Sequence, residues 1–177
     1  MTTVALKDNI LAADTQLTVG DVKLISADKI SILNKYTVFA GAGETNAIIL
    51  AERFFRDEDW ETKLDKRPEI PKEKEEDDPL DAILIFKGQT FIVDRFLLPE
   101  PLKHPYYAIG SGWKFALAGM HMGMSAVDAV EFASNFDVYT NNKIRWLNVK
   151  EFQETSKTQS GRTKRTPRVA QAQEESR

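Results

Sequence analysis

The alternation of apolar and polar residues along the chain predicts several pairs of short β-strands. The first pair meets at Lys7-Asp8-Asn9, and a later pair meets at the turn Lys87-Gly88-Gln89, which is typical of a hairpin. Strands joined by such short turns are antiparallel neighbours. The expected strands are residues 4–6, 10–13, 29–33, 36–40, 82–86, 90–96 and 144–149.

Helical periodicity appears in three places between these strands. Apolar residues between positions 47 and 54 share one face of a helix that follows the segment FAGAGET. Two further helices are expected at residues 111–121 and 125–136, and Ser125 and Asp128 have the spacing of a capping box at the start of the second. Blocks of strands alternate with blocks of helices, which favours an α+β fold with helices covering antiparallel sheets.

Two segments depart from these patterns. Residues 56–79 contain three prolines and no sustained apolar period, so we expect an acidic surface insertion. Residues 150–177 are polar and carry more basic than acidic side chains, so we expect a disordered basic tail. The sequence therefore predicts a single domain at residues 2–149, followed by the tail.

Composition excludes several kinds of chemistry. The 177 residues include no cysteine, which rules out disulfides, thiolate nucleophiles and thiolate metal sites. The two histidines, His104 and His121, have no partner at metal-ligand spacing. No apolar run approaches the roughly 20 residues of a membrane span, and no signal-peptide pattern is present, so we expect no membrane association and a cytoplasmic location. The net charge of −3 and an acidic domain argue against nucleic-acid binding.

Thr2 is a candidate nucleophile that needs no histidine. Methionine is readily removed before a small residue, and removal of Met1 would give Thr2 both a hydroxyl and a free α-amine. An α-amine has a pKa of about 7.7–8.0 and can act as a base at neutral pH. Taken alone, Thr2 and Thr3 also suit an ordinary polar strand position.

Such a nucleophile needs three supports. A lysine ammonium near the amine lowers the pKa of the amine, a carboxylate keeps that lysine charged, and backbone N–H groups receive the oxyanion. Asp14 at the end of the second expected strand and Lys29 at the start of the third are placed to supply the first two. A glycine turn at residues 41–43 is placed to supply the third.

Several segments, in order, resemble the HslV family of proteasome-like threonine peptidases, which are N-terminal nucleophile hydrolases. The similarity begins with TTVAL and ILAADTQLTVG, continues in FAGAGETNA, and returns in YYAIGSGWKFALAG and DVYTNN. These segments touch most of residues 2–55 and 106–147. The resemblance implies a four-layer αββα sandwich of antiparallel sheets and hydrolysis of peptide bonds.

Carried over position by position, the resemblance implies a catalytic set. Thr2 would be the nucleophile, Lys29 its electrostatic activator and Asp14 the residue that orients Lys29. Ser111 would join the hydrogen bonds around the amine. Gly43 would donate the oxyanion N–H, with Gly41 as the alternative.

The resemblance also implies a cation and partners. A monovalent cation such as Na⁺ would bind backbone carbonyls at Ser134, Asp137 and Thr140, with no other cofactor required. The partners would be a peptide or unfolded-protein substrate, further copies of the chain in a homo-oligomeric ring, and an ATP-dependent unfoldase.

The sequence departs from the family in two places. The interval from Asp14 to Lys29 is one residue shorter than in the family, which leaves Lys23 as an alternative activator. The segment EIPKEKEEDDP stands where the family has a long second helix that takes part in subunit packing. A catalytically silent, proteasome-like scaffold or interaction protein is therefore the alternative function.

Overall fold

Two five-stranded sheets, each fully antiparallel, form the body of the protein. The computed structural model describes residues 2–19, 22–25, 27–71, 79–159 and 170–171. The first sheet has the order β10-β1-β2-β11-β12, and the second has the order β5-β6-β7-β8-β9. The strands of the first sheet are Thr3–Lys7 (β1), Ile10–Asp14 (β2), Tyr106–Gly110 (β10), Ile144–Asn148 (β11) and Ala170–Gln171 (β12). Those of the second are Ile30–Asn34 (β5), Thr37–Gly43 (β6), Leu80–Phe86 (β7), Gln89–Asp94 (β8) and Glu100–Pro101 (β9).

A separate hairpin and the helices complete the fold. The hairpin pairs Gln16–Val19 (β3) with Val22–Ile25 (β4). The helices are Thr45–Phe55 (α1), the 3₁₀ helix Trp60–Lys66 (η1), Trp113–His121 (α2), Ala126–Ser134 (α3) and Val149–Gln159 (α4). No helix in the described part of the chain is long and apolar enough to cross a membrane.

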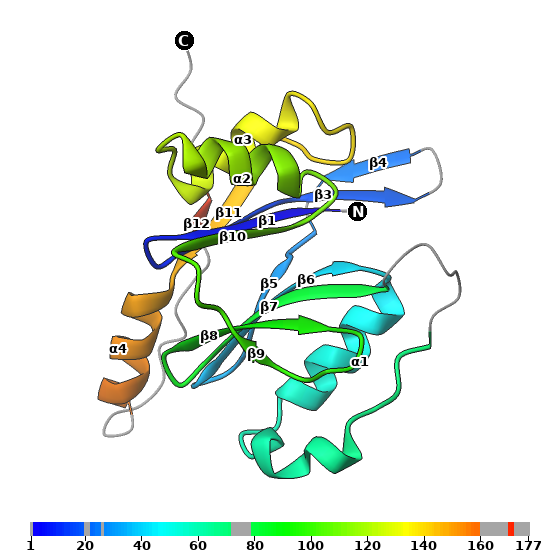
Figure 1. The fold of residues 1–177 in the computed structure, drawn as a ribbon, viewed down its shortest axis with the longest axis vertical. Coiled ribbons are helices and arrows are strands. Elements are labelled where there is room, and N and C mark those ends of the chain that lie inside the picture. The colour runs from blue at the N-terminus through cyan, green and yellow to red at the C-terminus, as the bar shows by residue number, and fades with distance from the viewer. Residues whose placement is uncertain (1, 20–21, 26, 72–78, 160–169, 172–177) are drawn as a thin grey trace.

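Alternation along the first strands explains how the layers stack. On β1, Val4 points into the apolar cluster between the two sheets, whereas Ala5 joins the cluster under α2 and α3. On β2, Leu11 and Ala12 divide in the same way. Successive strand residues face opposite sides, so a strand covered on both faces reads as a continuous apolar run. Figure 1 shows α2 and α3 on the outside of the first sheet and α1 on the outside of the second.

The predicted hairpins and the first helices are confirmed, with shifted ends. β1 pairs with β2 and β7 pairs with β8 as expected, and Ser125 Oγ accepts a hydrogen bond from the Asp128 amide at the start of α3. The glycine turn is wrong: residues 41–43 are the last three residues of β6 and pair with β7. Of these three residues, Gly43 alone has a positive φ, of 127°, which glycine adopts readily. The other two continue the strand.

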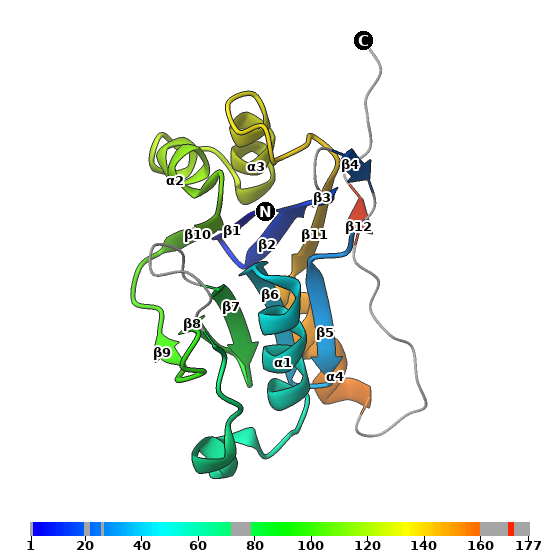
Figure 2. The same ribbon diagram turned by 90° about the vertical axis from the view of Figure 1, so that its right-hand side faces the viewer.

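The expected insertion and tail both contribute to the core. In the segment 56–79, Trp60 and Ile70 are buried, and the Trp60 ring lies 5.1 Å from Phe55 and 5.0 Å from Phe86. Residues 72–78 lie outside the described residues. The prediction of a disordered tail is wrong at residues 150–159, which belong to helix α4. The helix is held against the domain because Phe152 packs into the apolar cluster between the sheets. Figure 2 shows α4 beside the lower end of β5.

Candidate active site

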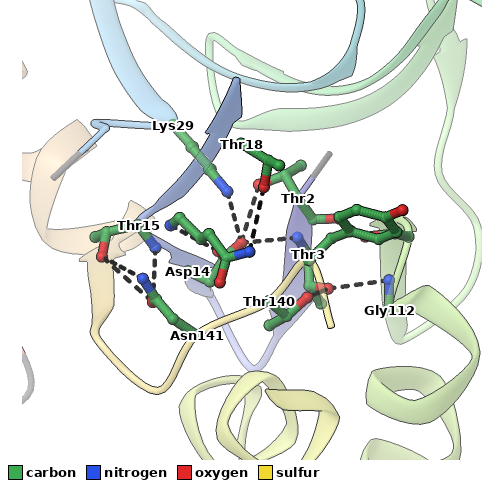
Figure 3. Close-up of polar contacts among 12 residues, drawn as sticks. Thr2, Thr3, Asp14, Thr15, Thr18, Lys29, Gly112, Thr140 and Asn141 are labelled. Carbon is green, nitrogen blue, oxygen red and sulfur yellow. Dashed lines mark hydrogen bonds and ion pairs between the residues drawn. The ribbon is translucent and has the colours of Figure 1, made fainter. Parts of the chain in front are cut away.

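Asp14 is the centre of the polar site at the N-terminal end of β1. It is the last residue of β2 and is almost completely buried. Its Oδ1 accepts hydrogen bonds from Thr2 Oγ1 at 3.0 Å, from the Thr3 amide at 2.8 Å and from Lys29 Nζ at 2.8 Å. Its Oδ2 accepts one from the Gln16 amide at 2.8 Å. Figure 3 shows Thr2 and Lys29 converging on this carboxylate.

Antiparallel pairing explains why Thr2 and Asp14 meet. Val4 lies opposite Ala13 in the β1–β2 ladder, so the residues just before β1 lie beside the end of β2. Lys29 immediately precedes β5, and its side chain reaches Asp14 from the start of that strand. The sequence therefore brings a hydroxyl, a carboxylate and an ammonium together from three separate segments.

Lys29 is the lysine that reaches the carboxylate. Its side chain is 9% exposed, and the paired Asp14 side chain is 0% exposed. Burial lowers the pKa of Lys29 below its usual value, while the charge and hydrogen bond of Asp14 and the charge of Asp137 oppose that shift. Lys23, the alternative activator, is exposed on β4.

A second hydrogen-bond network surrounds the backbone of Thr2. The Thr2 carbonyl accepts from the Ser111 amide at 2.7 Å and from Ser111 Oγ at 3.3 Å. Ser111 Oγ also lies 2.6 Å from Asp137 Oδ2, which accepts from Thr140 Oγ1 at 2.6 Å. Thr140 Oγ1 in turn lies 2.6 Å from Thr3 Oγ1. The loop after α3 thereby fixes both threonines at the start of β1.

Gly110 permits the close approach of this network to Thr2. It has a φ of 87°, and a Cβ at this position would lie 1.9 Å from the Thr2 carbonyl oxygen. L-residues with side chains rarely adopt such a φ, so glycine suits this position on two grounds. Ser111 follows directly and can turn its amide toward Thr2.

Thr2 lines a pocket of about 420 Å³ between β3, β6 and α1. Ala40 is the last residue of β6 that pairs with β5, so residues 41–43 of β6 have a strand neighbour only in β7. Gly41 and Gly43 both line the pocket with Thr2, and both remain candidates for the oxyanion N–H. The lining is formed by Thr2, Gln16, Leu17, Thr18, Ala27, Asp28, Lys29, Gly41, Ala42, Gly43, Glu44, Thr45, Ile48, Ile49 and Glu52.

The residues expected at the cation site lie at the join between α3 and β11. Ser134 Oγ donates to the Glu131 carbonyl, and the Asp137 carbonyl accepts from the Thr140 amide at 3.1 Å. Carbonyl oxygens are hard ligands that suit cations without redox chemistry, and a carbonyl has two lone pairs. The donor chemistry fits the expected Na⁺, which stays a prediction. Among the described residues, no group of three His, Cys, Asp or Glu side chains forms a metal site.

The sequence pattern does not predict the parts that four polar residues play. Thr3 and Gln16 join the network without being candidate site residues. Asp137 and Thr140 join it through their side chains, whereas the resemblance implies only their backbone carbonyls. One signal was available for Thr3, because it directly precedes the apolar run at residues 4–6, which is buried on both faces of the strand. Buried polar side chains are normally hydrogen-bonded, so such positions indicate a polar network.

Comparisons with known proteins identify the fold through structure alone. No protein-family model matches the sequence, and no curated protein matches it. Solved structures do match, including the eukaryotic HslV from Trypanosoma brucei, which is 20% identical with a TM-score of 0.62 and covers 82% of this chain and 97% of its own. The chain has the fold of these structures.

Two structures of BPH from Thiobacillus denitrificans give the same result. One is 21% identical with a TM-score of 0.59 and covers 82% of this chain and 95% of its own. The other, in complex with epoxomicin, is 18% identical with a TM-score of 0.58 and covers 82% of this chain and 96% of its own. At these identities the likeness concerns the mixed α/β fold with antiparallel sheets, and the chemistry has to be argued from the site.

Proposed function

We propose that the protein is a threonine peptidase of the HslV type, which hydrolyses peptide bonds through an acyl-enzyme on Thr2 after removal of Met1. One observation carries the proposal: Thr2 Oγ1 and Lys29 Nζ both bind the buried Asp14 carboxylate, and Thr2 lines a pocket. A hydroxyl, a lysine and an orienting carboxylate are the parts that an N-terminal nucleophile requires. The likeness to HslV supports the same reading through the fold.

The proposed reaction begins with attack by Thr2 Oγ1 on the substrate carbonyl carbon. The α-amine of Thr2 accepts the hydroxyl proton, and a backbone N–H near Gly43 donates a hydrogen bond to the oxyanion. When the carbon–nitrogen bond breaks, the leaving amine takes the proton from the Thr2 ammonium and an ester remains on Oγ1. The amine then removes a proton from water, and the water oxygen attacks the ester carbonyl carbon. The Thr2 ammonium returns this proton to Oγ1 as the bond between the carbonyl carbon and Oγ1 breaks and the acid product leaves.

Lys29 and Ser111 have different proposed parts in this reaction. The Lys29 ammonium disfavours a second positive charge nearby and so lowers the pKa of the α-amine, which keeps the amine unprotonated and able to accept a proton at neutral pH. Ser111 donates to the Thr2 carbonyl and thereby fixes the backbone from which the amine projects. Asp14 keeps Lys29 in place.

The proposal extends to assembly and partners. We propose the four-layer αββα sandwich, a homo-oligomeric ring that encloses Thr2, and a cytoplasmic location. Peptides or unfolded proteins would be the substrates, an ATP-dependent unfoldase a partner, and Na⁺ a ligand of the carbonyls near Asp137. Light scattering tests the ring, since a strict monomer across micromolar concentrations contradicts it.

The chemistry is tested at Thr2. The mass of the purified chain should correspond to loss of Met1, and electrophiles that trap an N-terminal threonine should add to Thr2 with a matching mass increase. Thr2→Ala should abolish both peptide hydrolysis and labelling, whereas Thr62→Ala, at an exposed position in η1, should leave both unchanged. Retention of Met1, or undiminished hydrolysis by Thr2→Ala, contradicts the mechanism and favours the scaffold.

A further inference from the structure

The wall of the Thr2 pocket carries more negative than positive charge. Four ionisable side chains line it: Asp28, Lys29, Glu44 and Glu52. Two of these have opposite charges close by, because Asp28 pairs with Arg145 at 2.5 Å and Lys29 pairs with Asp14. Among the described residues, neither Glu44 nor Glu52 has an ion pair.

Glu52 is held in a defined position on this wall. It lies in the last turn of α1, is half-buried, and its Oε1 accepts a hydrogen bond from Ser31 Oγ on β5 at 2.5 Å. Ser31 lies two residues beyond Lys29, so the same strand end that supplies the lysine also fixes this carboxylate. A carboxylate fixed in this way loses little side-chain entropy when it binds a cation.

The helix between the two glutamates supplies an apolar track. Ile48 and Ile49 line the pocket between Glu44 and Glu52, and Glu44 and Glu52 are eight residues apart, or about 12 Å along the helix axis. A side chain that lies along this lining would contact the alkyl surface of Ile48 and Ile49 between the two carboxylates. Lysine and arginine suit this lining, with an apolar stem and a charged head.

We infer that the pocket selects peptides with a lysine or arginine on the carbonyl side of the bond to be cleaved, with Glu52 as the specificity-determining residue. This inference rests on the proposed peptidase function, which supplies the reacting carbonyl at Thr2. The cationic head would bind Glu52, and Glu44 would add to the negative potential at the mouth of the pocket. Acidic residues at the same substrate position are disfavoured because like charges would face each other without a counterion.

The experiment compares peptides that differ only at that position, with arginine, norleucine or glutamate. Wild-type kcat/KM should be at least tenfold higher for arginine than for norleucine and lowest for glutamate. Glu52→Gln, which keeps the shape and an acceptor for Ser31, should reduce the arginine preference to about twofold or less. Glu131→Gln, an exposed glutamate on α3, is the matched control and should keep the full preference.

Binding to the Thr2→Ala variant separates the inference from the peptidase proposal. Calorimetry with the same peptides should show tighter binding of arginine than of norleucine, with a difference that shrinks as salt is added. Cleavage of all three peptides with equal kcat/KM overturns the inference and leaves the peptidase function standing. Arginine-selective binding without cleavage by the wild type supports the cation-selective pocket and overturns the peptidase function. The absence of both binding and cleavage overturns both proposals.

If Glu52→Gln does not fold, the negative charge of the pocket is reduced instead at Glu44, which is exposed. Glu44→Gln should lower the arginine preference of the folded enzyme by a smaller factor of about two to three. An unchanged preference in Glu44→Gln, together with no dependence of wild-type selectivity on salt, overturns the inference.

Discussion

Substitution of Gly110 tests whether the close approach of β10 to Thr2 holds the site together. In Gly110→Ala, the new Cβ would lie 1.9 Å from the Thr2 carbonyl oxygen, and the residue would keep a φ of 87°. The contact is with backbone, so relief requires the start of β1 or the Ser111 turn to move. The first cost is the strained φ, at about 1–2 kcal/mol for a residue with a side chain.

The second cost comes from the hydrogen bonds that this movement breaks. The Thr2 carbonyl accepts from the Ser111 amide at 2.7 Å and from Ser111 Oγ at 3.3 Å. Each bond is worth about 0.5–1.5 kcal/mol net, and more if the carbonyl stays buried without a partner. We therefore expect Gly110→Ala to lower the free energy of unfolding by about 2–5 kcal/mol.

Gly123→Ala is the matched control. Gly123 has a φ of 102°, but a Cβ there meets nothing within 4 Å, so this variant carries the strain without the clash. It should lose about 1–2 kcal/mol. Urea unfolding measures both, since a difference of 2 kcal/mol separates the midpoints by about 1 M at typical slopes. Labelling of Thr2 by electrophiles should fail only in Gly110→Ala, and equal destabilisation of the two variants would refute the reasoning.

Three further predictions concern other parts of the molecule. Asp14→Asn should cost about 3–5 kcal/mol in the free energy of unfolding, measured in urea, because it removes one partner of a buried ion pair. Lys29→Met should shift the acidic limb of the pH–rate profile to higher pH and lower the rate, whereas Lys23→Met should leave the limb in place. Phe152→Ala should cost about 3–5 kcal/mol by thermal or urea unfolding, since Phe152 is buried between the sheets; an unchanged stability would contradict the packing of α4.

The parts of the fold that follow from local patterns could be predicted from the sequence. The β7–β8 hairpin has an apolar strand on each side of Lys87-Gly88, and both turn residues take a positive φ, which glycine and a tight turn favour. The local pattern does not predict strand β10, although YYAIG is apolar, because this strand is defined by its pairing with β1 about 100 positions earlier. The sequence pattern does not predict helix α4, because Val149 and Phe152 lie among polar residues. Both side chains pack into the apolar cluster between the two sheets, which is a long-range contact.

The candidate site shows the same division between local and long-range information. Thr2, Asp14 and Lys29 were proposed from chemical type and from the resemblance, and the structure brings the three together. Sequence alone could not choose between Lys29 and Lys23, because the choice depends on the β3–β4 hairpin, which carries Lys23 away on an exposed strand. The carboxylate of Asp137 reaches Ser111 only through the turn after α3, and no spacing in the sequence predicts that contact.

The Asp14–Lys29 pair allows a test of whether the lysine is retained for stability or for chemistry. Asp14 accepts two backbone amides besides the lysine, so Lys29→Met leaves a carboxylate that still has hydrogen-bond partners, and the expected loss at neutral pH is only about 1–2 kcal/mol.

The pH dependence of the free energy of unfolding tests the contribution of Lys29 to stability. Burial holds the pKa of Lys29 below its usual 10.5, so between that lowered pKa and 10.5 the unfolded chain binds more protons than the folded chain. The Lys29 contribution to the free energy of unfolding therefore rises with pH across this window, and Lys29→Met should flatten the rise. A variant that stays folded, loses the rise and loses hydrolysis would assign the lysine to chemistry. If Lys29→Met instead costs as much stability as Asp14→Asn, the ammonium is needed for folding and its proposed role at the amine loses this support.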